Sequence, residues 1–106
     1  MEAVAKESKQ VMEQIAKSLG YNSVFDFARI EIRNKVLQKI AYYQSRVDYY
    51  EHKYGMNFEI FRNRVVNQDD PVLSQFGIIE KEDDDMEWEA AVMFIKGFHI
   101  DLNELV

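Results

Sequence analysis

A run of acidic residues near the C-terminus holds the first candidates for chemistry in this 106-residue chain. A calcium loop of the EF-hand type needs oxygen ligands at alternate positions around a central glycine, whereas this run has consecutive acids and no glycine. Acidic side chains are favoured in the first turn of a helix, where the helix dipole is positive. We therefore expect the run to open a helix and to face a basic partner or a basic surface of the same chain. The acids are Glu80, Glu82, Asp83, Asp84 and Asp85.

Carboxylates three residues apart within this run suggest an alternative, a metal-dependent enzyme. The pairs Glu80/Asp83 and Glu82/Asp85 each place two side chains on one face of a helix. Small all-α nucleotide pyrophosphatases hold magnesium between such motifs on two facing helices, and this run supplies one of the two. We keep a small metal-dependent nucleotide pyrophosphatase as an alternative function.

Other catalytic arrangements are missing from the sequence. His52 and His99 are the only histidines, and neither belongs to a His-Glu-x-x-His motif. The chain has no cysteine, which excludes disulfides, thiolate zinc sites and cysteine nucleophiles. Its four glycines are too far apart to form a phosphate-binding loop. We therefore predict a non-catalytic protein with no catalytic residues, no cofactor and no metal.

The charge distribution narrows the range of partners. Residues 1–66 carry 11 Lys and Arg against 8 Asp and Glu, whereas residues 67–106 carry 2 against 11. The acidic C-terminal part repels phosphates and anionic lipids, so a nucleic acid partner is not expected. No apolar run approaches the length of a membrane-spanning helix, and the start does not resemble a secretion signal. We expect a cytoplasmic protein that does not bind membranes.

Glycine, the residue favoured just past a helix end, divides the chain into the elements that position these residues. The four glycines are Gly20, Gly55, Gly77 and Gly97, and each is expected to close a helix. Apolar residues at helical spacing predict an amphipathic helix from about Ala3 to Leu19. Ser23 followed by Asp26 is close to a capping box, which predicts that a second helix starts there.

The second helix is expected to be unusually long, because neither glycine nor proline interrupts it before Gly55. It would extend about 31 residues, or roughly 46 Å. Its apolar residues alternate in steps of four and three, the spacing of a coiled-coil seam. The seam either folds against the C-terminal segments or pairs with a second copy, and we favour a homodimer. Its residues are Val36, Ile40, Tyr43, Val47, Tyr50 and Tyr54.

Shorter elements are expected after Gly55. Asn57 can cap a short helix, and Asp70-Pro71 can open a further turn. A last, acidic helix is predicted from about Lys81 to Lys96 and is expected to end at Gly97. The tail from residue 98 to 106 fits either an extended segment or another helical turn.

The segment from Gly20 to Val36 resembles the turn and second helix of ribbon-helix-helix proteins. Gly20-Tyr21, Ser23, Asp26-Phe27, Arg29, Ile32-Arg33 and Lys35-Val36 match that family's pattern in register. The resemblance implies a two-helix dimerisation unit. The family reads DNA with a basic strand before the first helix, and residues 1–3 contain an acid and neither Lys nor Arg. Many members are antitoxins whose following segment blocks a toxin.

Together these features predict an all-α, homodimeric interaction protein forming one helical domain over residues 1–106. Residues 3–54 would be the dimerisation scaffold, and residues 57–106 the partner-facing or self-packing part. The leading function is an antitoxin-like neutralising or adaptor protein that binds a basic prokaryotic protein, such as a toxin. Trp88, Phe94 and the acidic run would form the binding site. Trp88 could instead fill the core. A DNA-binding regulator of ribbon-helix-helix ancestry is a further alternative.

Overall fold

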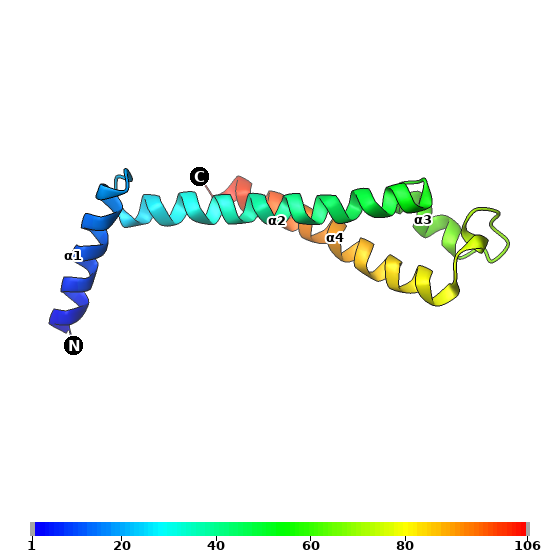
Figure 1. Ribbon diagram of the computed structural model, residues 1–106, viewed down its shortest axis with the longest axis horizontal. Helices are drawn as coiled ribbons and strands as arrows, with labels where there is room; N and C mark the ends of the chain where they lie inside the picture. Colours follow the sequence, from blue (N-terminus) through cyan, green and yellow to red (C-terminus); the bar gives the residue numbers. More distant parts are fainter. Residues whose placement is uncertain (1, 106) are drawn as a thin grey trace.

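The computed structural model describes the backbone of residues 2–105 and the side chains of residues 7–105, and it is all-α over this range (Figure 1). This confirms the predicted fold class. Met1 and Val106, which belong to the predicted N-terminal and tail segments, lie outside the described residues. The elements are α1 (Glu2–Ser18), α2 (Val24–Tyr54), α3 (Phe58–Val65), the short 3₁₀ helix η1 (Leu73–Gln75) and α4 (Ile78–Glu104).

The long helix α2 has the predicted boundaries. At its start the Ser23 hydroxyl accepts a hydrogen bond of 3.0 Å from the backbone N–H of Asp26. At its end Gly55 adopts the left-handed conformation, with φ 72°, and its N–H donates to the carbonyl oxygen of Glu51. A residue with a Cβ is strained in that conformation, which explains why the helix ends at a glycine. Local sequence signals therefore determine both ends of α2.

The second half of α2 and α4 lie side by side as an antiparallel hairpin, and α3 lies at its closed end (Figure 1). Aromatic residues from all three helices form the core at that end, where Trp88 contacts the rings of Tyr50, Tyr54, Phe58 and Phe61. Trp88 itself is 0% exposed. The largest fully buried side chains among the described residues therefore include Trp88, Tyr50 and Phe61, where the three helices meet.

Helix α4 is longer than predicted at both ends. It starts at Ile78 and continues through Gly97 to Glu104, so Gly97 does not end it and the described part of the tail is helical. A glycine inside a helix costs about 1 kcal/mol relative to alanine. Packing offsets this cost, because Phe98, just after the glycine, stacks with Tyr43 of α2 at 6.3 Å between ring centroids. Gly77 also departs from the prediction, since it precedes α4 as its N-cap.

The molecule is elongated, with principal extents of 69 × 26 × 20 Å. Its radius of gyration is 21.8 Å, whereas a compact chain of this length has about 13 Å. Helix α4 runs along only part of α2, and α1 turns away at the other end (Figure 1). The N-terminal half of the molecule is therefore left without a covering layer.

The loop between α3 and α4 is held by Asp70, which is 4% exposed. Its carboxylate accepts hydrogen bonds from the Arg64 guanidinium at 2.7 and 3.0 Å. It also accepts bonds from the backbone N–H groups of Val72 and Leu73, so it starts the 3₁₀ turn that the Asp-Pro pair predicted. The Arg64 bonds, followed by the Leu73 bond, lower the pKa of Asp70 to about 2.

We expect this carboxylate to make stability depend on pH in the acid range. Its pKa is lower in the folded state than in the unfolded chain, where it is about 3.9, so its contribution is present above pH 4 and is lost as the pH falls towards 2. Urea unfolding at several pH values would compare the protein with Asp70→Asn, which keeps an acceptor oxygen but no charge. The stability difference should be largest above pH 4 and should shrink towards pH 2. A difference that stays constant with pH would contradict this role.

Candidate protein-interaction site

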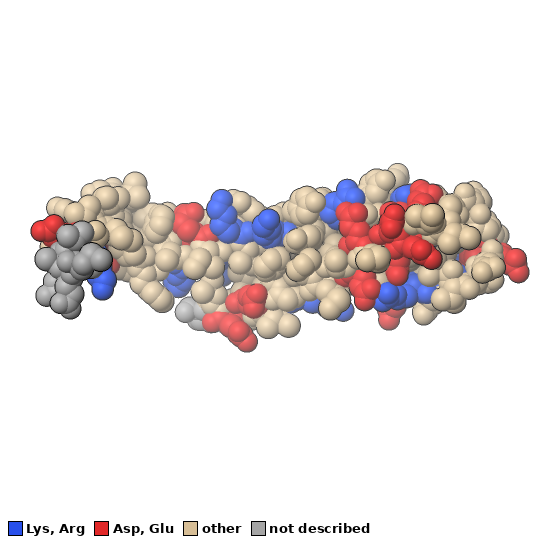
Figure 2. Space-filling view, turned by 90° about the horizontal axis from the view of Figure 1, so that it is seen from below, with Lys and Arg blue, Asp and Glu red and all other residues tan. Residues whose placement is uncertain are grey.

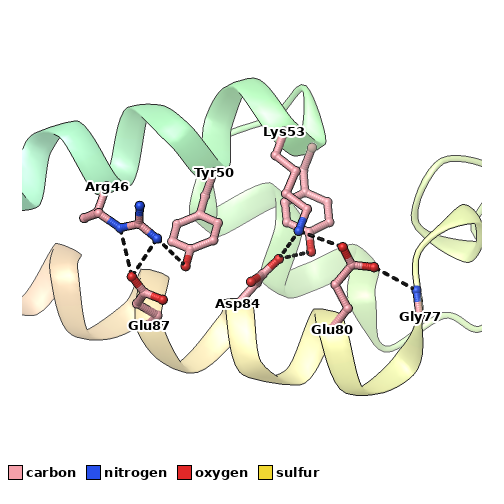
Figure 3. Close-up of polar contacts among 8 residues, drawn as sticks. Arg46, Tyr50, Lys53, Gly77, Glu80, Asp84 and Glu87 are labelled. Carbon is pink, nitrogen blue, oxygen red and sulfur yellow. Dashed lines mark hydrogen bonds and ion pairs between the residues drawn. The ribbon is translucent and has the colours of Figure 1, made fainter.

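The acidic run forms the start of α4, where it faces basic residues of α2 in the same chain (Figure 3). Lys53 lies between two carboxylates, with its Nζ 2.7 Å from Asp84 Oδ2 and 2.8 Å from Glu80 Oε2. The Tyr54 hydroxyl donates to the same Asp84 oxygen at 2.5 Å. Glu80 also accepts a bond from the backbone N–H of Gly77, so it caps α4 while it pairs with Lys53.

Two further basic residues, Arg46 and Arg62, continue this arrangement along the hairpin with three ion pairs. Two turns along α2 from Lys53, the Arg46 guanidinium donates to Glu87 Oε1 at 2.8 Å and to the Tyr50 hydroxyl at 3.2 Å. On the α3 side, Arg62 contacts Asp85 at 3.2 Å and Glu89 at 2.8 Å. Basic residues of α2 and α3 thus oppose the acidic residues of α4 on both sides of the core.

The ion pairs of Lys53, Arg46 and Arg62 with α4 form a ladder along the hairpin. The pKa values of its residues favour a structural role for this ladder at neutral pH. Hydrogen bonding to Asp84, and then to Glu80, raises the pKa of Lys53 above its usual range, so the ammonium group stays charged. Burial, and then the bond to Asp84, raises the pKa of Tyr54, and burial raises the pKa of Tyr50 to about 12. At neutral pH Lys53 is therefore charged, and Tyr50 and Tyr54 are neutral hydrogen-bond donors.

These contacts change the interpretation of most residues in the predicted partner-binding site, because those residues make contacts within the chain. Trp88 fills the core and is not accessible to a partner, which is the role we had set out as its alternative. Glu80, Asp84 and Asp85 pair within the chain, and Phe94 stacks on Tyr43 at 4.8 Å. The hairpin brings basic residues of α2 and α3 to the acids, and this proximity is not visible in a linear pattern. Figure 2 shows acidic and basic side chains adjacent on this part of the surface.

Glu82 and Asp83 are the exceptions in the acidic run. Both are exposed, and neither forms an ion pair with a residue that the structure describes. Phe94 is also 47% exposed although it stacks on Tyr43, so these three members of the predicted site remain open to a partner.

A metal ion held by carboxylates would need acidic residues of α2 and α4 to converge. Asp48 and Glu51 of α2 are three residues apart, a spacing that matches the pairs in the acidic run. However, among the described residues no group of three or more His, Cys, Asp or Glu side chains is close enough to hold a metal ion.

The predicted dimer seam of α2 is largely occupied by α4 of the same chain. Val47, Tyr50 and Tyr54 are buried in the core. Tyr43 is stacked between α2 and α4, on Phe94 and Phe98, whereas Val36 and Ile40 are half-buried further towards the N-terminus. The seam therefore packs against the C-terminal segment, which is one of the two possibilities that its spacing allowed. Tyr43, Tyr50 and Tyr54 are consequently not free to contact a second copy.

The turn between α1 and α2 fixes the geometry of the N-terminal half. The backbone N–H of Val24 donates to the Glu13 carboxylate at 3.3 Å. Tyr21 contacts Phe27 edge-to-face at 5.1 Å and donates a hydrogen bond to Glu31. The two helices therefore meet in a defined corner, although few residues of one touch the other.

An apolar groove of about 140 Å³ lies in this corner. Its lining side chains are only partly covered, since Leu19 is 63% exposed and Ile15 is 52% exposed. Val11 continues the apolar surface along α1 and is also half exposed. The sequence predicted the α1 stripe, but it did not indicate that Met12 and Phe27 complete the groove. The lining residues are Met12, Ile15, Ala16, Leu19, Val24 and Phe27.

No known protein family, curated protein or solved structure matches the chain. Among the described helices, none combines the length and the apolar character needed to cross a membrane. The functional argument therefore depends on the residues and surfaces described above.

Proposed function

We propose that the chain is a non-catalytic protein-interaction module that forms a homodimer through α1 and the first half of α2. The observation that carries this proposal is the open apolar groove between these helices. Contiguous exposed apolar surface of this kind is typical of protein–protein contacts, because leaving it in water is unfavourable.

A second copy is the occupant that fits this surface best. A two-fold contact requires one surface to be complementary to itself. Here α1 supplies both projecting side chains, such as Leu19, and one wall of a groove that can receive them. The same segment resembles the dimerisation unit of ribbon-helix-helix proteins, which supports the same arrangement.

The hairpin of α2 and α4 would then extend from the dimer and carry an acidic surface. Residues 67–106 contain 11 acids against 2 bases, which favours a basic protein as the partner. Because Glu80, Asp84 and Asp85 already pair within the chain, Glu82 and Asp83 would supply most of the steering charge. An antitoxin-like adaptor that captures a basic protein, such as a toxin, is consistent with this layout.

Ile15→Asp is expected to convert the dimer into a folded monomer. The side chain is half exposed in the single chain, so the aspartate costs little there, but in a dimer it would be buried without a partner. Light scattering should show the mass halved, while circular dichroism and the melting temperature of the monomer stay close to normal. Gln14→Asp adds the same charge at the neighbouring exposed position and should leave the dimer intact. An unmutated protein that is monomeric at high concentration would refute the proposed dimer.

A further inference from the structure

A pocket of about 620 Å³ lies where the end of α3, the η1 segment and the start of α4 meet. Its volume is in the range that is typical of small-molecule sites, about 300–1,000 Å³. It shares no lining residue with the groove between α1 and α2. Much of its wall is apolar, and Lys81 adds an ammonium group to this wall. The apolar residues are Val65, Val66, Phe76 and Ile78.

Lys81 is the unusual member of this pocket. The residue is only 8% exposed, whereas lysine is almost never buried in proteins unless it is paired. Within the described part of the chain its ammonium group forms neither an ion pair nor a side-chain hydrogen bond. Its nitrogen is not covered, since the covered side-chain atoms without a partner in the described structure belong to Asp85 and Trp88. The ammonium group therefore faces the pocket without a counter-ion.

The other basic residues of the hairpin show what Lys81 lacks. Of the six Lys and Arg residues from position 46 onward, four form ion pairs with carboxylates of the same chain. Lys96 forms none, but it is exposed and water solvates its charge. Among these residues Lys81 alone is both buried and without a carboxylate. A buried charge without a partner is unfavourable, so an anion from outside the chain would be stabilised here.

The acidic residues that line the pocket do not supply this anion. Asp85 lies one turn after Lys81 on the same side of α4, but its Oδ2 pairs with Arg62 at 3.2 Å and its Oδ1 has no partner. Glu82 is exposed, so water screens its charge. The positive end of the α4 dipole, at Ile78, also lies at this pocket. The ammonium group of Lys81 is therefore the charge that acts inside the pocket.

We propose that this pocket binds a small monocarboxylic acid with an apolar body. The carboxylate pairs with Lys81, and the apolar body covers Phe76 and the other apolar residues of the wall. The Ser74 hydroxyl also lines the pocket and can donate to the second carboxylate oxygen. A single negative charge fits better than a phosphate, because Glu82 and the other acids at the start of α4 oppose a second one.

4-Phenylbutyrate is a suitable probe, and 4-phenylbutyramide is its uncharged match in shape. We expect the acid to bind to the full chain and to shift the NMR signals of the backbone amides of Ser74, Phe76 and Ile78. The amide should bind about tenfold or more weakly, as expected when a charge-assisted hydrogen bond is lost.

Lys81→Met keeps the apolar stem of the side chain and removes the ammonium group. It should weaken binding of 4-phenylbutyrate about tenfold or more and leave the affinity for the amide unchanged. The variant should unfold at the same temperature or a higher one, because a buried charge without a partner is removed. Lys96→Met is the matched control, since Lys96 is exposed on the same helix and does not line this pocket. It should leave the binding of both probes unchanged.

Equal binding of the acid and the amide to the unaltered protein would overturn the proposal, and this comparison does not depend on the folding of a variant. An affinity for the acid that Lys81→Met leaves unchanged would overturn it as well. So would the absence of any shift at millimolar 4-phenylbutyrate, or shifts confined to Val24 and Phe27 in the groove between α1 and α2. The dimer is judged separately, from the mass of the protein without a probe.

Discussion

Trp88→Ala is expected to destabilise the free protein by about 3–5 kcal/mol, the usual cost of removing a large buried aromatic side chain. Domains are stable by about 5–15 kcal/mol, so this variant should be close to unfolded. The physical reason is the position of the indole, which is 0% exposed and is in contact with aromatic rings from both α2 and α3. Urea denaturation followed by circular dichroism would measure the loss.

Trp88→Phe is the matched control for this experiment. It keeps an aromatic ring in the core, and it removes an indole N–H that is buried without a hydrogen-bond partner in the described structure. A buried polar group without a partner is unfavourable, so phenylalanine should restore much of the stability that alanine loses. If Trp88→Ala instead unfolds at the same urea concentration as the original protein, then Trp88 is not the centre of the core.

Features determined by neighbouring residues could be predicted from the sequence. Ser23 and Asp26 identified the start of α2, and Gly55 identified its end, because capping requires residues that are close along the chain. The same local reasoning failed at Gly97. There, packing of Phe98 on a residue more than 50 positions earlier outweighs the preference of glycine for a helix end.

The role of the candidate site was harder to predict, because the residues that face the acidic run are set by how the hairpin folds. The acidic run is equally suited to a partner or to the chain's own basic residues until α4 is placed against α2. Once it is, Lys53 lies between Glu80 and Asp84.

The length of α2 explains why surface remains for partners. Its seam extends over the whole helix, but α4 runs beside only part of it and does not reach its start (Figure 1). The buried seam residues therefore begin at Val47, whereas Val36 and Ile40 are half-buried and Ile32 is 52% exposed. The first half of α2 together with α1 is left for association. The stability of the hairpin can be tested separately from that association.

Asp84→Ala is expected to destabilise the free protein by about 2 kcal/mol, in the range found for hydrogen bonds to charged groups. The substitution leaves the buried Tyr54 hydroxyl without its acceptor, and Lys53 retains only Glu80. Asp83→Ala removes the same carboxylate from the adjacent, exposed position and should change stability by less than about 0.5 kcal/mol. Thermal unfolding of the two variants provides the comparison.

The two variants also separate the structural from the partner-facing part of the acidic run. If a basic protein is captured, Asp83→Ala should slow its association in a salt-dependent way and leave unfolding unchanged, because exposed charges mainly affect the rate of encounter. Asp84→Ala should instead lower the stability and leave the association rate unchanged, because the charge of Asp84 is already neutralised by Lys53 at 2.7 Å. Equal losses of stability in the two variants would contradict this structural role of Asp84. Neighbouring residues on a helix project in different directions, and Asp84 faces Lys53 of α2 (Figure 3).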